Sequence, residues 1–93
     1  MTKNKDIRFN QVTCVEHWED NELTFASLIN AIKSGHAKDV VYEMSSWPKS
    51  DLDPIYYSEI LRKALEVNET IVYDDFNYLL AANNDIIVLY KRI

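Results

Sequence analysis

Apolar residues in the first half of the chain follow two different spacings. Residues 7–15 are rich in β-branched and aromatic side chains and predict a strand. Residues 24–35 have the helical spacing, with Thr24 as a candidate N-cap and Gly35 as a stop, and predict a helix. Residues 39–44 alternate between apolar and polar and predict a second strand. The apolar stripe of the predicted helix comprises Phe25, Leu28, Ile29 and Ile32. One face of the predicted second strand comprises Val40, Tyr42 and Met44.

A second helix is predicted after a polar loop at residues 45–53. Asp53 would cap this helix, and Pro54 would occupy its first position, where a missing N–H does no harm. Asn68 would end it in a left-handed turn. The expected buried stripe is Tyr57, Leu61, Ala64 and Leu65. On the outer face, the expected ion pairs are Glu59 with Lys63 and Arg62 with Glu66.

Three further strands are predicted at residues 70–73, 78–82 and 85–92. Asn83 and Asn84 would supply the positive φ angles of a tight hairpin turn between the last two strands. The last strand is apolar on both faces, which places it in the centre of the sheet. The predicted fold is a single α+β domain spanning residues 1–93. It has the order β-α-β-α-β-β-β, a mainly antiparallel sheet of about five strands, and two helices packed on one side.

The composition is that of a packed globule with an acidic body. The 93 residues are 47% hydrophobic and 27% charged, with one glycine, and the net charge is −5. Residues 10–90 hold five basic and fourteen acidic side chains, so this part carries −9. Such a charge repels nucleic acid and anionic lipid and attracts basic protein surfaces. We therefore expect a protein partner, with no nucleic acid and no membrane bound.

The expected location is a reducing cytoplasm. Cys14 is the single cysteine and cannot form an internal disulfide, which suits a reducing compartment. The first residues are polar, with no apolar signal segment behind them. No apolar run approaches the roughly 20 residues that a membrane-spanning helix requires.

No combination of residues predicts catalysis or a cofactor. Cys14 and His17 are three residues apart on an extended segment, so their side chains should lie on opposite faces. Together with His36 they lack a fourth metal ligand and any standard spacing. A single glycine excludes the usual phosphate-binding loops. The sequence therefore predicts a protein that is not an enzyme, with no metal and no cofactor.

Acidic residues recur along the whole body with few bases between them. Any one acidic pair taken alone is better explained as solvated surface charge, but the joint pattern matches the rows of phosphates that DNA presents to its binding proteins. A rigid protein bearing such rows can occupy a DNA-binding groove with little loss of conformational entropy. The candidate phosphate-mimicking residues are Glu16, Glu19, Asp20, Glu22, Asp39, Glu43, Asp51, Asp53, Glu69, Asp74 and Asp75.

The chain also resembles a known family. The stretch from Ile7 to Phe25, IRFNQVTCVEHWEDNELTF, together with the length and the acidic body, is similar to the Arn family of small anti-restriction proteins from T-even bacteriophages. The resemblance implies a phage-encoded DNA mimic that inhibits the host's modification-dependent restriction endonuclease, of the McrBC type. The resemblance implies no catalytic residue in this chain.

The function expected from the sequence is thus inhibition of a host restriction endonuclease, or of another DNA-binding protein, by occupation of its DNA-binding site. The alternative is an immunity-type or antitoxin-type module that caps one basic enzyme site by shape as well as charge. Three aromatic residues around the loop at 45–53 have two interpretations, a homodimer surface or part of the core. They are Trp47, Tyr56 and Tyr57.

Overall fold

The computed structural model describes residues 7–20, 23–50 and 52–93. No helix in these ranges has both the length and the apolar character needed to cross a membrane. The elements in chain order are β1 (Arg8–Glu16), α1 (Phe25–Lys33), α2 (Ala37–Met44), β2 (Ile55–Tyr56), α3 (Tyr57–Glu66), β3 (Thr70–Asp74), β4 (Tyr78–Ala82) and β5 (Ile86–Arg92).

The five strands form one antiparallel sheet in the order β2-β1-β5-β4-β3. This confirms the predicted α+β class, the antiparallel sheet of five strands and the central place of the last strand. β2 takes the place of the predicted strand at residues 39–44, and the described residues form three helices rather than the predicted two. β5 is central because it is apolar on both faces, so that each face must be covered. Its neighbours β1 and β4 pair along most of its length.

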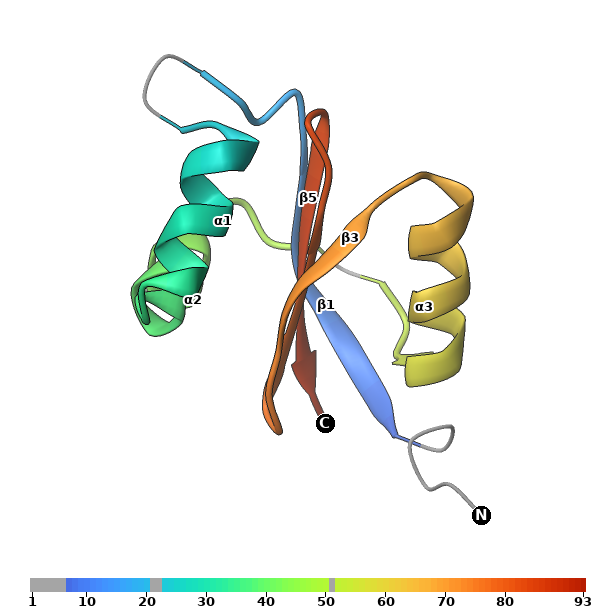
Figure 1. The fold of residues 1–93 in the computed structure, drawn as a ribbon. Coiled ribbons are helices and arrows are strands. Elements are labelled where there is room, and N and C mark those ends of the chain that lie inside the picture. Colours follow the sequence, from blue (N-terminus) through green and yellow to red (C-terminus); the bar gives the residue numbers. More distant parts are fainter. Residues whose placement is uncertain (1–6, 21–22, 51) are drawn as a thin grey trace.

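The helices cover both faces of the sheet (Figure 1). Ile87 and Leu89 of β5 pack in a cluster with α1 and α2. The alternate residues Val88 and Tyr90 pack in a second cluster with Ile60 of α3. Two helices share one face of the sheet, as predicted. They are α1 and α2, however, and not α1 and the helix predicted after residue 53. The predicted second helix, α3, lies on the opposite face, because both sides of β4 and β5 are apolar and need cover.

Two bulges change which side chains face each cluster. In β1 the pairing with β5 shifts between Gln11 and Thr13, so Val12 is an extra residue. In β3 the pairing with β4 shifts in the same way around Val72. Beyond each bulge the alternation of side chains is reversed relative to a regular strand. Cys14 consequently lines the same hollow as Gln11, on the α3 side of the sheet.

The outer edge of β1 is covered by the segment between α2 and α3. β2 pairs with Arg8 and Phe9 at one end. Further along, the Ser50 N–H donates to the carbonyl of Val12 at 2.9 Å, and the buried Thr13 hydroxyl donates to the carbonyl of Pro48 at 2.6 Å. The loop therefore satisfies polar groups that an uncovered edge strand would expose.

The predicted strand at residues 39–44 is wrong, because this segment is helix α2. Alternation would have buried Tyr42, which is 82% exposed. The buried residues of α2 are Ala37, Val41 and Met44, at i, i+4 and i+7. The segment turns directly back from α1 through Gly35, at φ 89°, a conformation that favours glycine.

The predicted start of the second helix is also wrong. Asp53 and Pro54 precede a short strand instead, and α3 begins at Tyr57 with Tyr56 as its N-cap. Pairing with β1 overrides the local capping signal, since the Tyr57 N–H also donates to the carbonyl of Ile7 at 2.9 Å. Asn68 does adopt the predicted left-handed conformation, at φ 60°.

The buried face of α3 agrees with the predicted stripe at Tyr57 and Ala64 but not at Leu61 and Leu65, which are exposed. Ile60 and Ala64 are buried, whereas Leu65 is 79% exposed. Positions 57, 60 and 64 also have a helical spacing, and contact with the sheet selects this face over the predicted one.

The turn between β4 and β5 does not use the positive φ angles predicted for Asn83 and Asn84, neither of which has one. The Asn83 side-chain oxygen instead accepts hydrogen bonds from the N–H groups of Asp85 and Ile86, both at 2.8 Å. This is the local side-chain turn that asparagine favours. The Asn83 amide also donates to the carbonyl of Val67, just after α3.

Leu28→Ala tests the core beneath α1. Leu28 is 7% exposed and belongs to the cluster that joins α1 and α2 to the sheet. Its truncation should lower the free energy of unfolding by about 2–5 kcal/mol, measured by urea denaturation. Asn30→Ala on the exposed side of the same helix is the control, with an expected change within about 0.5 kcal/mol. Equal stability of the two variants would contradict the assigned helix face.

Candidate functional site

Most of the predicted phosphate-mimicking residues lie within the described part of the chain. Glu22 and Asp51 lie outside it. The others are not gathered in one place but are spread over the end of β1, the following connection, α2, the loop before β2, and β3. Nowhere among the described residues do three or more His, Cys, Asp or Glu side chains come close enough to hold a metal ion. Of the predicted phosphate-mimicking residues that the structure describes, the exposed ones are Glu16, Asp20, Asp39, Glu43, Asp53 and Asp74.

Glu19 and Asp20 shape the connection between β1 and α1. Glu19 Oε2 accepts a hydrogen bond from the backbone N–H of Phe25, the first residue of α1, at 2.5 Å. A carboxylate is stabilising at this end of a helix because of the helix dipole. Asp20 Oδ1 accepts from the Leu23 N–H at 2.8 Å. These two carboxylates therefore hold local structure in addition to carrying charge.

Asp74 and Asp75 are similarly engaged at the end of β3. Asp74 Oδ2 accepts from the Tyr57 hydroxyl at 3.0 Å. Asp75 accepts from the N–H groups of Asn77 and Tyr78, both at 2.7 Å, and from the Tyr73 hydroxyl at 2.5 Å. Partial burial acts to raise the pKa of Asp75, but these hydrogen bonds and the charge of Lys38 bring it below its ordinary value.

Glu69 lies on the α3 side of the sheet and is half-buried. It lines a small hollow with Cys14, Lys63 and Tyr90. Burial raises the pKa of Glu69, and the charge of Lys63 partly opposes this. Glu69 is therefore poorly suited to present a permanent charge to a partner.

Among the described residues, direct ion pairs of carboxylates with lysine or arginine lie on the outer face of α3. Between described residues, the Lys or Arg ion pairs with carboxylates are both made by Arg62, to Glu66 at 3.1 Å and to Glu59 at 3.5 Å. The pair of Arg62 with Glu66 was predicted. Glu59 was predicted to pair with Lys63 but pairs with Arg62 instead. The exposed residues Glu16, Asp39, Glu43 and Asp53 have no such pair in the described part of the chain.

Cys14 and the two histidines have different neighbours among the described residues. The imidazole of His17 lies 2.6 Å from the carboxylate of Asp85, at the β4–β5 turn. His36 lies 3.4 Å from Asp39. Burial, followed by the charges of Glu69 and Glu16, raises the pKa of the Cys14 thiol, which disfavours the nucleophilic thiolate. These contacts give no arrangement of a nucleophile with a base.

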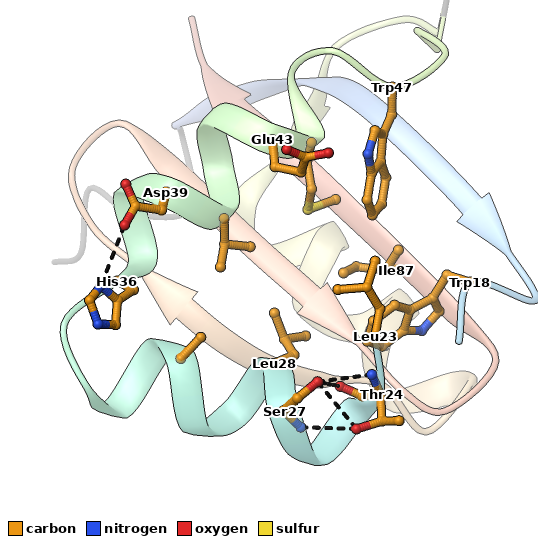
Figure 2. Close-up of a pocket in the computed structure, with 13 residues that line it drawn as sticks. Trp18, Leu23, Thr24, Ser27, Leu28, His36, Asp39, Glu43, Trp47 and Ile87 are labelled. Atoms are coloured by element: carbon orange, nitrogen blue, oxygen red, sulfur yellow. Dashed lines mark hydrogen bonds and ion pairs between the residues drawn. The ribbon is translucent and has the colours of Figure 1, made fainter. Parts of the chain in front are cut away.

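A groove between α1 and α2 was not predicted from the sequence. It has a volume of about 470 Å³, and its apolar lining includes Leu28, Met44 and Ile87. Both tryptophans of the chain, Trp18 and Trp47, line it as well. Figure 2 shows Trp47 and Glu43 extending from the α2 side, with Trp18, Leu23 and Ile87 at the same end of the groove. Helical spacing at Ala37, Val41 and Met44 was the signal that could have indicated a helix pair here.

Asp39 and Glu43 stand on the α2 side of this groove (Figure 2). They are four residues apart on one helix, so they lie on the same face. An alternating strand at residues 39–44 would likewise place both on one face, but the alternation alone does not show that an apolar groove lies beside them.

Asp75→Ala tests the structural role of a predicted mimic. Losing its hydrogen bonds to the β3–β4 turn should lower the free energy of unfolding by about 1–3 kcal/mol at neutral pH, measured by urea denaturation. Because the folded pKa of Asp75 is depressed, its contribution is present above the ordinary value of 3.8 and is lost as the pH falls through the folded pKa. The difference between wild type and variant should therefore shrink in acid. Asp75→Asn keeps an acceptor oxygen and should cost less; equal losses in the two variants would contradict this role.

Comparison of the chain with protein-family models, with curated proteins and with solved structures finds no match in any of the three.

Proposed function

We propose that this protein is an acidic, non-enzymatic inhibitor that occupies the DNA-binding site of a DNA-binding protein by imitating the charge of DNA. The target implied by the resemblance to the Arn family is a modification-dependent restriction endonuclease of the McrBC type in a bacterial host. Since the comparisons find no match, the proposal rests on charge and structure.

One observation carries the proposal. Exposed carboxylates on several elements are left without Lys or Arg partners, while the Lys or Arg ion pairs between described residues use a single arginine on α3. Exposed carboxylates without such partners act together at long range and attract a basic groove. The residues concerned are Glu16, Asp39, Glu43 and Asp53.

The fold supports the proposal by fixing where these carboxylates stand. Asp39 and Glu43 are held on a helix that packs on the sheet through buried residues, and Glu16 ends a strand paired with the central β5. Charges on such elements are pre-organised, so little conformational entropy is lost on binding. A disordered acidic segment would lose considerably more.

The groove favours a second candidate, an immunity-type module that caps one basic enzyme site. An apolar groove beside carboxylates gives shape selectivity that charge imitation alone does not require. The two candidates differ in partner range. A charge mimic should bind several DNA-binding proteins weakly, whereas a capping module should bind one partner tightly.

Amide substitution tests whether the unpaired carboxylates matter. The double variant Glu16→Gln/Asp53→Asn changes only charge, at two exposed positions outside the groove. It should displace a labelled, methylated duplex from an McrBC-type endonuclease about 2- to 30-fold less effectively than wild type, because each exposed interaction is worth roughly 0.2–1 kcal/mol. The measurement is fluorescence anisotropy of the duplex as inhibitor is added.

The matched control is Glu59→Gln/Glu66→Gln, which changes the net charge equally at carboxylates already paired with Arg62. It should reduce displacement less than the first pair does. Failure of the wild-type protein to displace duplex, or formation of a complex in which duplex and inhibitor are bound together, would exclude DNA mimicry.

Salt dependence separates the two candidates. Exposed charges are screened beyond about 10 Å at 0.1 M salt and beyond about 3 Å at 1 M. For a charge mimic, the association constant with the target should fall steeply across this range, as measured by isothermal titration calorimetry at several salt concentrations. A nearly constant affinity would instead favour the shape-driven capping module.

A further inference from the structure

The polar groups that line the groove are mostly engaged within the protein. Ser27 N–H donates to Thr24 Oγ1 at 3.1 Å, and Thr24 N–H donates to Ser27 Oγ at 2.9 Å, in a reciprocal cap of α1. Trp18 Nε1 donates to the carbonyl of Asn83 at 2.7 Å. A ligand that depends on neutral hydrogen bonds therefore finds few of them here. Recognition depends on apolar contact and on the charges at the rim.

Apart from His36, which lies 3.4 Å from Asp39, the charged side chains at the rim are of one sign. The described residues that line the groove include Asp39 and Glu43, together with His36, but no lysine or arginine. Side chains at i and i+4 on a helix have Cβ atoms roughly 5–6 Å apart. Two cations one helical turn apart on a partner would match this pair, while an anionic ligand would be repelled.

The walls of the groove suit a helix better than an extended peptide. Strand addition requires an unpaired sheet edge, whereas the groove is lined by side chains from α1, α2 and the segments flanking them. The nearby edge of β1 is already occupied by β2 and the segment at residues 48–50. Leu23, 44% exposed, adds an apolar side chain at the rim.

We infer that this groove binds a basic amphipathic helix of the partner protein. One aliphatic or aromatic side chain of that helix enters between α1 and α2, and lysines or arginines one turn apart contact Asp39 and Glu43. The inference rests on the proposed function in that the partner presents a basic surface. It adds an apolar anchor that DNA does not have, so that the protein would bind its target more selectively than a charge mimic alone.

The two tryptophans allow a direct test, since both line the groove. The probe is a synthetic helix of roughly 18 residues containing leucine, alanine and lysine, with leucines at i, i+3, i+4 and i+7 and lysines one turn apart beside them. It contains no tryptophan, so the emission reports only the protein. Binding should shift the tryptophan emission to shorter wavelength and saturate. The same peptide with glutamate in place of lysine should cause no shift.

Variants separate apolar insertion from simple charge attraction. Ala31→Leu fills the groove from a half-exposed position of α1 and should weaken peptide binding at least tenfold. Leu23→Ser removes the apolar rim and should act in the same direction. Asp39→Asn/Glu43→Gln should also weaken binding severalfold, while Glu59→Gln/Glu66→Gln, which changes two carboxylates paired with Arg62 outside the groove, should leave it unchanged. Far-UV circular dichroism and urea denaturation establish that each variant is folded.

Two outcomes would overturn the inference. One is the absence of any tryptophan shift with the lysine peptide, and the other is equal binding by Ala31→Leu, Leu23→Ser and wild type. The duplex competition assay distinguishes failure of this inference from failure of the proposed function. If wild type and Ala31→Leu displace duplex equally well, DNA mimicry stands and a role of the groove in target binding is excluded. Peptide binding by a wild-type protein that displaces no duplex would retain the groove and exclude the mimic.

Discussion

The structure depends on a central strand that is apolar on both faces. Ile87 and Leu89 require cover on one side of the sheet, and Val88 and Tyr90 require it on the other. With β4 beside it, β5 creates two separate apolar surfaces in a chain of 93 residues. A helix pair covers one surface and a single helix covers the other. The pair leaves the groove between its members, so the candidate site is a consequence of how the first surface is covered.

Much of the fold could be predicted from local patterns. The strand at the start, the helix capped by Thr24 and the central position of the last strand each follow from a pattern that long-range contacts reinforce. The errors arise where such contacts override or reinterpret the pattern. Residues 39–44 alternate and also have helical spacing, and the tight turn at Gly35 selects the helix. Pairing with β1 delays α3 beyond the local capping signal at Asp53 and Pro54.

The candidate site was less predictable than the fold. Net charge and the list of acidic residues could be read from the sequence, but their roles could not. Glu19 and Asp75 bind backbone N–H groups, and Glu69 is half-buried, whereas Asp39 and Glu43 stand exposed beside a groove. These differences depend on contacts between residues far apart in the sequence. The tryptophans 29 positions apart, Trp18 and Trp47, meet at one groove for the same reason.

The strand order has a consequence for the way this chain acquires its structure. β1 is made early, yet its main partner β5 follows every other element along the chain. During synthesis β1 therefore has only the two-residue β2 and a loop to pair with until β5 is complete. Contacts between residues so distant in sequence slow the search for the native state. The sheet should consequently form in a late, cooperative step, while the local contacts of α1 with α2 can form much earlier.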